Sequence, residues 1–90
     1  MKISDEFVLR KIAEDYIIVP TGKTILEFNG MLTVNEIGAF LWNKLQEEVS
    51  FDELVEAVLD EYEVSKEEAA KDIREFLDIL IKGKILKPEE

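Results

Sequence analysis

Few side chains in this sequence have the chemistry that catalysis requires. The chain contains neither Cys nor His, which excludes thiolate nucleophiles, disulfides, thiolate metal sites and imidazole acid–base chemistry. Ser50 and Ser65 are each followed by Glu three residues later, a spacing that predicts helix N-caps rather than activated nucleophiles. Pairs of carboxylates are common among the 21 acidic residues, but a solvated acidic surface explains them. We therefore expect no enzymatic activity, no metal site and no cofactor.

The last predicted helix, residues 66–82, carries the clearest candidates for a binding site. At about 3.6 residues per turn, its apolar residues divide into two arcs about 80–100° apart. The first arc holds Ala69, Ile73, Phe76 and Leu80, with Asp72 at its border, and the second holds Ala70, Leu77 and Ile81. One apolar stripe is enough to pack a helix on a core. The second arc therefore either belongs to the core or lines a groove.

Four basic residues lie on the same helix, in the more acidic half of the chain: Lys66, Lys71, Arg74 and Lys82. One interpretation is solvated surface, in which Lys71–Glu75 and Arg74–Asp78 are i,i+4 pairs that contribute only a few tenths of a kcal/mol. The other is that Lys71 and Arg74 form charge-assisted hydrogen bonds with a carboxylate on a peptide partner.

Charge and length limit the class of protein. The net charge is -10, and residues 46–90 account for -9 of it, with 15 acidic and 6 basic residues. Nucleic-acid binding depends on neutralising phosphates with Lys and Arg, so we expect no nucleic-acid partner. No apolar run has the length of a membrane span or a signal peptide, which predicts a cytoplasmic protein without a membrane partner. A chain of 90 residues fits one domain, residues 1–90.

The front of the chain, about residues 7–34, has the pattern of antiparallel strands. The predicted strands are Phe7–Ile12, Tyr16–Pro20, Ile25–Phe28 and Met31–Val34. Asn29-Gly30 suits a type I′ turn and predicts a tight hairpin between the last two. One face of this hairpin would carry Leu26, Phe28, Met31 and Thr33, and the other Ile25, Glu27, Leu32 and Val34. Because both faces are largely apolar, the second is either covered by a helix, which we favour, or open to a partner.

The back of the chain, about residues 35–82, has the pattern of three helices. Asn35, Ser50 and Ser65 are the predicted N-caps, and the last two begin capping boxes with Glu53 and Glu68. Gly83 is placed to end the third helix, and Ile85-Leu86 could add a short closing strand. Strands followed by helices predict an α+β fold, with two short helices and a longer one in a winged helix-turn-helix-like arrangement beside an N-terminal antiparallel hairpin.

The order and spacing of several segments resemble the PqqD-like family over about residues 7–86. These segments are Phe7–Arg10, Leu32–Trp42, Phe51–Leu54, Glu61-Tyr62, Ala70–Asp72, Phe76-Leu77 and Gly83–Leu86. The founding member of that family is the peptide chaperone of pyrroloquinoline quinone biosynthesis, and the wider class is the recognition element of ribosomally made, post-translationally modified peptides. Val34 and Ile37 stand where the family usually has Leu and Thr.

The resemblance implies a peptide-binding module that works by β-strand addition. The leader segment of a precursor peptide would pair with the strand edge at Met31–Val34, and its apolar side chains would lie between that edge and the last helix. The module would then present the peptide to a modifying enzyme, typically a radical S-adenosylmethionine enzyme. The predicted peptide-binding residues are Met31, Leu32, Thr33, Val34, Lys66, Ala70, Lys71, Arg74, Leu77 and Ile81.

Two other functions fit the same pattern of elements. A winged helix-turn-helix is also a DNA-reading fold, so a DNA-binding regulator is one alternative; the acidic second helix, which would face phosphates, argues against it. A structural scaffold or dimerisation module is the other. An unpaired strand edge also favours pairing between copies of the chain, so a homodimer is an expected possibility.

Overall fold

Three antiparallel strands precede three helices in the computed structural model, which describes residues 1–3, 6–21 and 32–86. The elements are β1 (Phe7–Ile12), β2 (Asp15–Pro20), β3 (Leu32–Val34), α2 (Glu36–Lys44), α3 (Phe51–Glu61) and α4 (Lys66–Lys82). This order confirms the predicted α+β fold, while the winged helix-turn-helix description stays a prediction. The predicted strand Ile25–Phe28 and the Asn29-Gly30 turn lie outside the described residues.

The strands form one sheet in the order β1-β2-β3. β1 and β2 pair from Phe7↔Pro20 to Ile12↔Asp15, which leaves Ala13 and Glu14 as a two-residue loop. Ala13 has a φ of 57°, and such a positive φ is what a two-residue hairpin loop requires. β3 pairs with β2 from Ile18↔Leu32 to Tyr16↔Val34. β3 is therefore an edge strand whose second side has no strand partner among the described residues.

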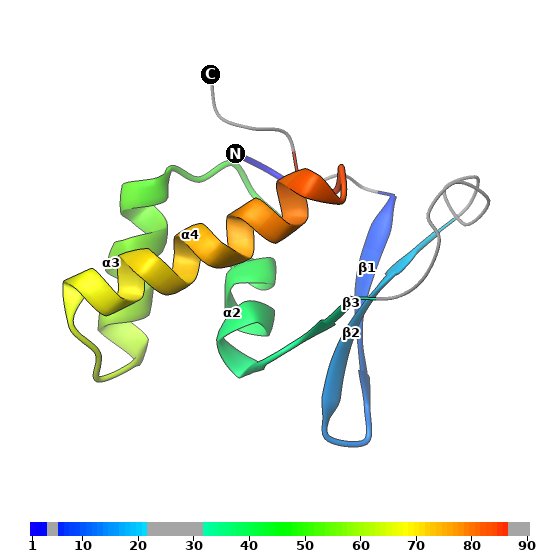
Figure 1. The fold of residues 1–90 in the computed structure, drawn as a ribbon, viewed down its shortest axis with the longest axis horizontal. Helices are drawn as coiled ribbons and strands as arrows, with labels where there is room; N and C mark the ends of the chain where they lie inside the picture. Colours follow the sequence, from blue (N-terminus) through cyan, green and yellow to red (C-terminus); the bar gives the residue numbers. More distant parts are fainter. Residues whose placement is uncertain (4–5, 22–31, 87–90) are drawn as a thin grey trace.

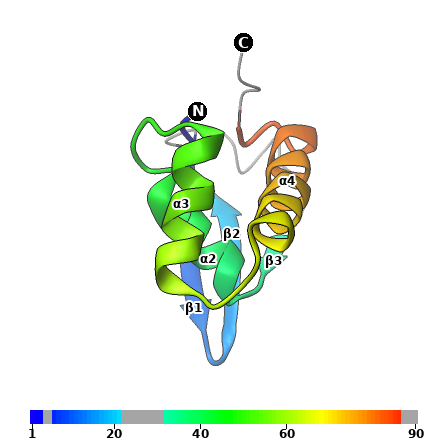
Figure 2. The same ribbon diagram turned by 90° about the vertical axis from the view of Figure 1, so that its left-hand side faces the viewer.

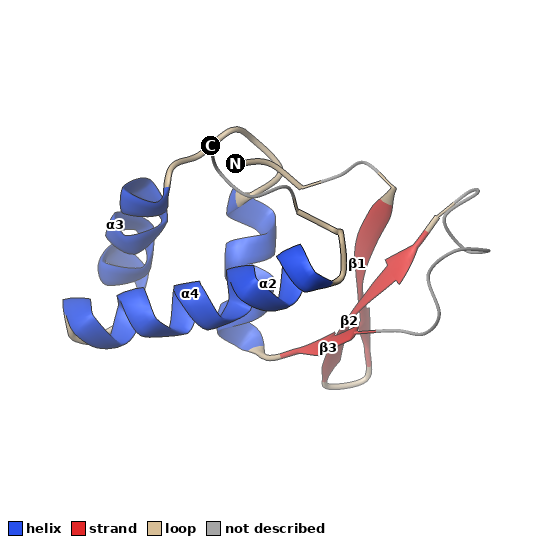
Figure 3. Ribbon diagram, turned by 45° about the horizontal axis from the view of Figure 1, so that its top comes forward, coloured by secondary structure: helices blue, strands red, loops and turns tan. Residues whose placement is uncertain are grey.

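The helices lie on one side of this sheet, as Figures 1 and 3 show. Side chains alternate between the two faces of a strand, and the inner face carries Ile18, which is fully buried, together with Leu32 and Val34, which pack against the core. Thr33 points to the other face and is exposed. None of the described helices covers that outer face, so the helix cover that we expected there is not found in this part of the chain.

Local signals set the starts of the helices. The Asn35 side chain accepts a hydrogen bond from the Gly38 N–H at 2.8 Å. At the start of α3, the Ser50 hydroxyl accepts from the Glu53 N–H at 3.1 Å, and the Glu53 carboxylate accepts from the Ser50 N–H at 3.0 Å, which confirms the predicted capping box. For α4, the Ser65 hydroxyl accepts from the Glu68 N–H at 3.1 Å. All three predicted caps are present, but at Ser65 the return bond from its N–H to the Glu68 carboxylate is not formed, so the second predicted capping box is incomplete.

The last helix supplies much of the core and is fixed at its C-terminal end. Ile73 and Leu80 are fully buried, and Leu77 is 7% exposed.

The end of α4 is fixed by backbone hydrogen bonds. The Gly83 N–H donates to the Ile79 carbonyl at 3.1 Å as the helix ends. Beyond it, Leu86 forms a single antiparallel bridge with Ile3, so the short closing strand suggested at Ile85-Leu86 is reduced to one bridge. The amino group of Met1 donates to Glu48 and to the Val49 carbonyl, both at 2.7 Å.

An aromatic pair joins α2 to the end of α3. The rings of Phe40 and Tyr62 meet edge to face, with centroids 5.5 Å apart. Burial of Tyr62, and next the negative charges of Glu36 and Glu61, raise the pKa of its hydroxyl. Tyr62 is partly buried and packs against the core.

Candidate functional site

The outer edge of β3 is the element around which the candidate site is built. β3 pairs only with β2 in the described sheet. Successive residues of a strand turn their N–H and C=O groups to opposite edges, so every second residue of β3 offers both groups on the outer side. Figure 2 shows β3 on the same side of the molecule as α4, with α3 on the other side. The free edge thus faces a helix rather than another strand of the described sheet.

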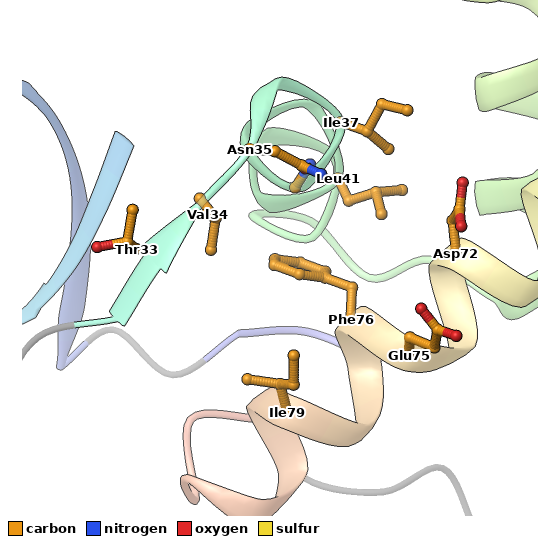
Figure 4. A pocket seen from close by; sticks show the side chains of 10 residues that line it. Thr33, Val34, Asn35, Ile37, Leu41, Asp72, Glu75, Phe76 and Ile79 are labelled. Atoms are coloured by element: carbon orange, nitrogen blue, oxygen red, sulfur yellow. The ribbon is translucent and has the colours of Figure 1, made fainter. Parts of the chain in front are cut away.

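A groove of about 250 Å³ separates β3 from α4. Its lining comes from Thr33, Val34, Asn35, Ile37, Gly38 and Leu41 on one side and from Asp72, Glu75, Phe76 and Ile79 on the other. Figure 4 shows Phe76 and Ile79 projecting from α4 toward Thr33 and Val34, with Asp72 and Glu75 farther along the helix. The groove therefore has an apolar part beside the strand and a carboxylate part beside the start of α2.

Gly38 sets how closely α2, β3 and α4 approach one another at the base of the groove. A Cβ at this position would lie 3.0 Å from the Cβ of Val34 and 3.2 Å from Cε1 of Phe76. Both separations are tighter than an ordinary van der Waals contact. Glycine at position 38 therefore permits the Phe76 ring, which is 8% exposed, to pack against the junction of β3 and α2.

Ile79 forms the open rim of the groove on α4. It is 48% exposed, and together with Ile12 it is one of two large apolar side chains that stand out as exposed in the described residues. A half-exposed apolar side chain beside a free strand edge loses contact with water when another segment occupies the groove. Ile79 is thus suited to contact a bound chain.

The groove continues past β3 toward the hairpin of β1 and β2. A second, wider hollow of about 700 Å³ shares Thr33, Val34 and Asn35 with the groove. Its other lining residues are Lys11, Ala13, Glu14, Asp15, Tyr16 and Glu36. An extended chain that lies along β3 has room to continue in this direction.

Two negative observations limit the chemistry. Among the residues that the structure describes, no group of three or more Asp, Glu, Cys or His side chains is arranged to hold a metal ion. Within the same residues, none of the helices has the length and apolar character to cross a membrane.

The family model for coenzyme PQQ synthesis protein D (PqqD) matches residues 15–86. The chain belongs to the PqqD family. A solved structure described as TbiB1 in complex with the TbiA(beta) leader peptide is similar to this PqqD-family chain, with a TM-score of 0.78 and 27% sequence identity. The similarity covers 100% of this chain and 99% of that one. A search of curated protein sequences finds no match.

The structure of this PqqD-family chain brings together only part of the predicted binding residues. Leu32, Thr33 and Val34 form β3, while Met31 lies outside the described residues. The other predicted residues, Lys66, Ala70, Lys71, Arg74, Leu77 and Ile81, line neither the groove nor its continuation. Their role in peptide binding stays a prediction, and the structure does not bring them to β3.

The predicted second arc lies on the opposite flank of α4. Arg74, Leu77 and Ile81 line a separate hollow of about 330 Å³ together with Met1 and Phe51. The Arg74 guanidinium lies 4.9 Å from the centre of the Phe51 ring, an energetically favourable cation–π distance. Ala70 packs partly buried against the core, and Lys66 and Lys71 are exposed. These residues therefore face α3 and solvent.

Sequence reasoning missed Glu75, Phe76 and Ile79 as groove residues and placed Asp72 only at the border of an apolar arc. Phe76 was assigned to the core, which agrees with its burial but omits its second role in the groove. The available signal was Ile79, an apolar residue that falls outside both arcs and lies three residues after Phe76. On a helix that spacing places both on one side.

Proposed function

We propose that this PqqD-family chain is a non-catalytic module that binds the leader segment of a precursor peptide and presents it to a modifying enzyme. The observation that carries the proposal is the groove between the free edge of β3 and α4. The similar TbiB1 structure, which was solved with a leader peptide, supports the class of ligand. Without Cys or His, the chain depends on its partner for the chemical step, and the family resemblance suggests a radical S-adenosylmethionine enzyme.

Strand addition explains how such a small site can bind a peptide. Backbone hydrogen bonds to the edge of β3 provide affinity that does not depend on sequence, and side-chain contacts in the groove provide selectivity. β3 has only three residues, so the ladder is short. We therefore expect side chains in the groove, against Phe76 and Ile79, to contribute a large share of the affinity.

Backbone N-methylation of the peptide tests strand addition directly. The probes are synthetic peptides encoded by short reading frames next to the gene, titrated into the isotope-labelled protein. N-methylation removes one hydrogen-bond donor at a time, and an added strand donates to β3 only at every second residue. We expect affinity losses that alternate along the peptide, and amide shifts concentrated at residues 32–34 and 72–79.

Two outcomes would contradict this mode of binding. Losses that recur every three or four residues indicate a helix lying in the groove instead of a strand. Amide shifts confined to α3 place the peptide on the acidic helix and remove β3 from the site. As a control, the unmodified and N-methylated peptides must have the same circular dichroism when free, so that the losses report contacts with β3.

A further inference from the structure

The lining of the groove and of its continuation is strongly acidic. Asp72 and Glu75 line the groove between β3 and α4, and three more carboxylates, Glu14, Asp15 and Glu36, line the hollow beyond β3. Among the described residues, Lys11 is the only basic one in either lining, and its ammonium lies 5.5 Å from the centre of the Tyr16 ring. A chain that occupies both parts therefore lies in a negative field.

Asp72 and Glu75 form no ion pair with any of the residues that the structure describes. Asp72 is partly buried and Glu75 is exposed. The ion pair found among the described residues joins the amino group of Met1 to Glu48, and the predicted pair Lys71–Glu75 does not form within this part of the chain. A partly buried carboxylate is stabilised when an opposite charge approaches it, because the charge compensates for lost hydration.

The spacing of the groove residues matches the spacing of an added strand. Asp72 and Phe76 are four residues apart on α4, about 6 Å along its axis. Side chains on one face of a strand recur every second residue, about 6.6–6.8 Å apart. Figures 1 and 4 show α4 and β3 running in roughly opposite directions along the groove. Two successive groove-facing side chains of a bound strand can therefore reach Phe76 and Asp72 in turn.

From this arrangement we propose that the bound segment carries an apolar side chain against Phe76 and Ile79 and, two residues away, a Lys or Arg side chain at Asp72 and Glu75. The inference rests on the proposed function and adds the charge of its ligand. It is an alternative to the hypothesis that a carboxylate of the leader meets Lys71 and Arg74, because Arg74 lies over Phe51 on the other flank of α4. A segment with acidic residues at these positions would be repelled by the groove and by the net charge of -10.

Selection from a random peptide library tests the charge independently of the sequence of the natural peptide. The probe is a library of displayed peptides about twelve residues long, enough for a strand with flanking residues, selected on the whole protein. Amide shifts then identify the selected peptides that bind in the groove. We expect these peptides to share Lys or Arg two residues from an apolar residue and to be depleted in Asp and Glu.

Charge-removing variants then assign the contact. For one groove-binding peptide, replacing its basic residue by Gln is expected to weaken binding about three- to tenfold in fluorescence anisotropy. The double variant Asp72→Asn with Glu75→Gln is expected to weaken binding of the original peptide by a similar factor and to remove the difference between the two peptides. Asp78→Asn is the matched control, because Asp78 lines the hollow on the opposite flank of α4. It is expected to leave the affinity for the original peptide and for the Gln-substituted peptide unchanged.

The possible failures separate the two proposals. Groove-binding peptides without a shared basic residue overturn the charge inference and leave the proposed function standing. The charge inference is also overturned if replacing the basic residue of the peptide by Gln weakens binding to the double variant as much as it weakens binding to the unchanged protein. If the selected peptides leave the amides of residues 32–34 and 72–79 unshifted, the groove is not a peptide site, and both proposals are overturned. Urea denaturation of the double variant verifies that a weaker affinity does not reflect unfolding.

Discussion

The two flanks of α4 carry similar apolar residues with different surroundings. On the flank facing α3, Leu77 is 7% exposed, and Arg74 lies over Phe51. On the flank facing β3, Ile79 is 48% exposed and lines an open groove. The first flank faces an eleven-residue helix, and the second faces a three-residue edge strand. The comparison teaches that the element opposite an apolar side chain decides whether it stabilises the fold or is left for a ligand.

The largest expected effect is on the α3 flank. Leu77→Ala removes a buried side chain from the core, and we expect the free energy of unfolding to fall by about 2–5 kcal/mol, the usual cost of such a truncation. Urea denaturation measures the loss. Peptide affinity, measured where the variant remains folded, should change little. A stable Leu77→Ala protein with weakened peptide binding would instead place Leu77 in the binding site.

A smaller loss is expected where the β3 flank is most closely packed. In Gly38→Ala the new Cβ meets Val34 and Phe76 at 3.0 and 3.2 Å, and overpacking typically costs about 1–3 kcal/mol. The higher helix propensity of Ala returns about 1 kcal/mol, so we expect a net loss of up to about 2 kcal/mol. Thermal or urea denaturation measures whether the free energy of unfolding falls or rises in this variant. A stabilised variant would mean that helix propensity outweighs the close approach of the three elements.

Ile79 should show the reverse of the behaviour expected for Leu77. Because Ile79 is half exposed, Ile79→Ala should lower the free energy of unfolding by less than about 1 kcal/mol. It should weaken peptide binding about fivefold, because apolar contact in the groove is lost. Ile12→Ala is the matched control, since Ile12 is 56% exposed and does not line the groove. Equal affinities of the two variants would remove the rim of α4 from the site.

The smallest effect is expected for Arg74, the basic residue on the flank of α4 that faces α3. Arg74→Ala removes the cation–π contact with Phe51, and we expect a loss of about 0.5–1 kcal/mol of stability. Arg10→Ala serves as the control because Arg10 is exposed on β1. Peptide affinity should be unchanged in both. A clear loss of affinity in Arg74→Ala alone would support the alternative hypothesis that this basic residue meets a carboxylate of the leader.

Local features of the sequence predicted the elements well. The bounds of β1 agree with the prediction, and the caps at Asn35, Ser50 and Ser65 are all formed. Each of these features depends on hydrogen bonds or side-chain alternation within a few residues, so a short stretch of sequence contains the relevant interaction. The strand edge at Met31–Val34 was predicted from the apolar hairpin pattern and the family resemblance, and its described part, Leu32–Val34, forms β3.

Only the tertiary structure shows which flank of α4 is buried and which borders an open groove. The sequence by itself determined that α4 has an apolar surface wider than one stripe, because the angles between its residues follow from helical geometry. It also determined that the chain lacks the Cys and His chemistry of many active sites. Only the packing of α2, α3 and β3 around α4 decided that Leu77 is buried and that Ile79 borders an open groove beside Asp72 and Glu75. The physical reason is that helical periodicity gives the relative directions of side chains, whereas burial depends on elements that are distant in the sequence and reach α4 only in the folded chain.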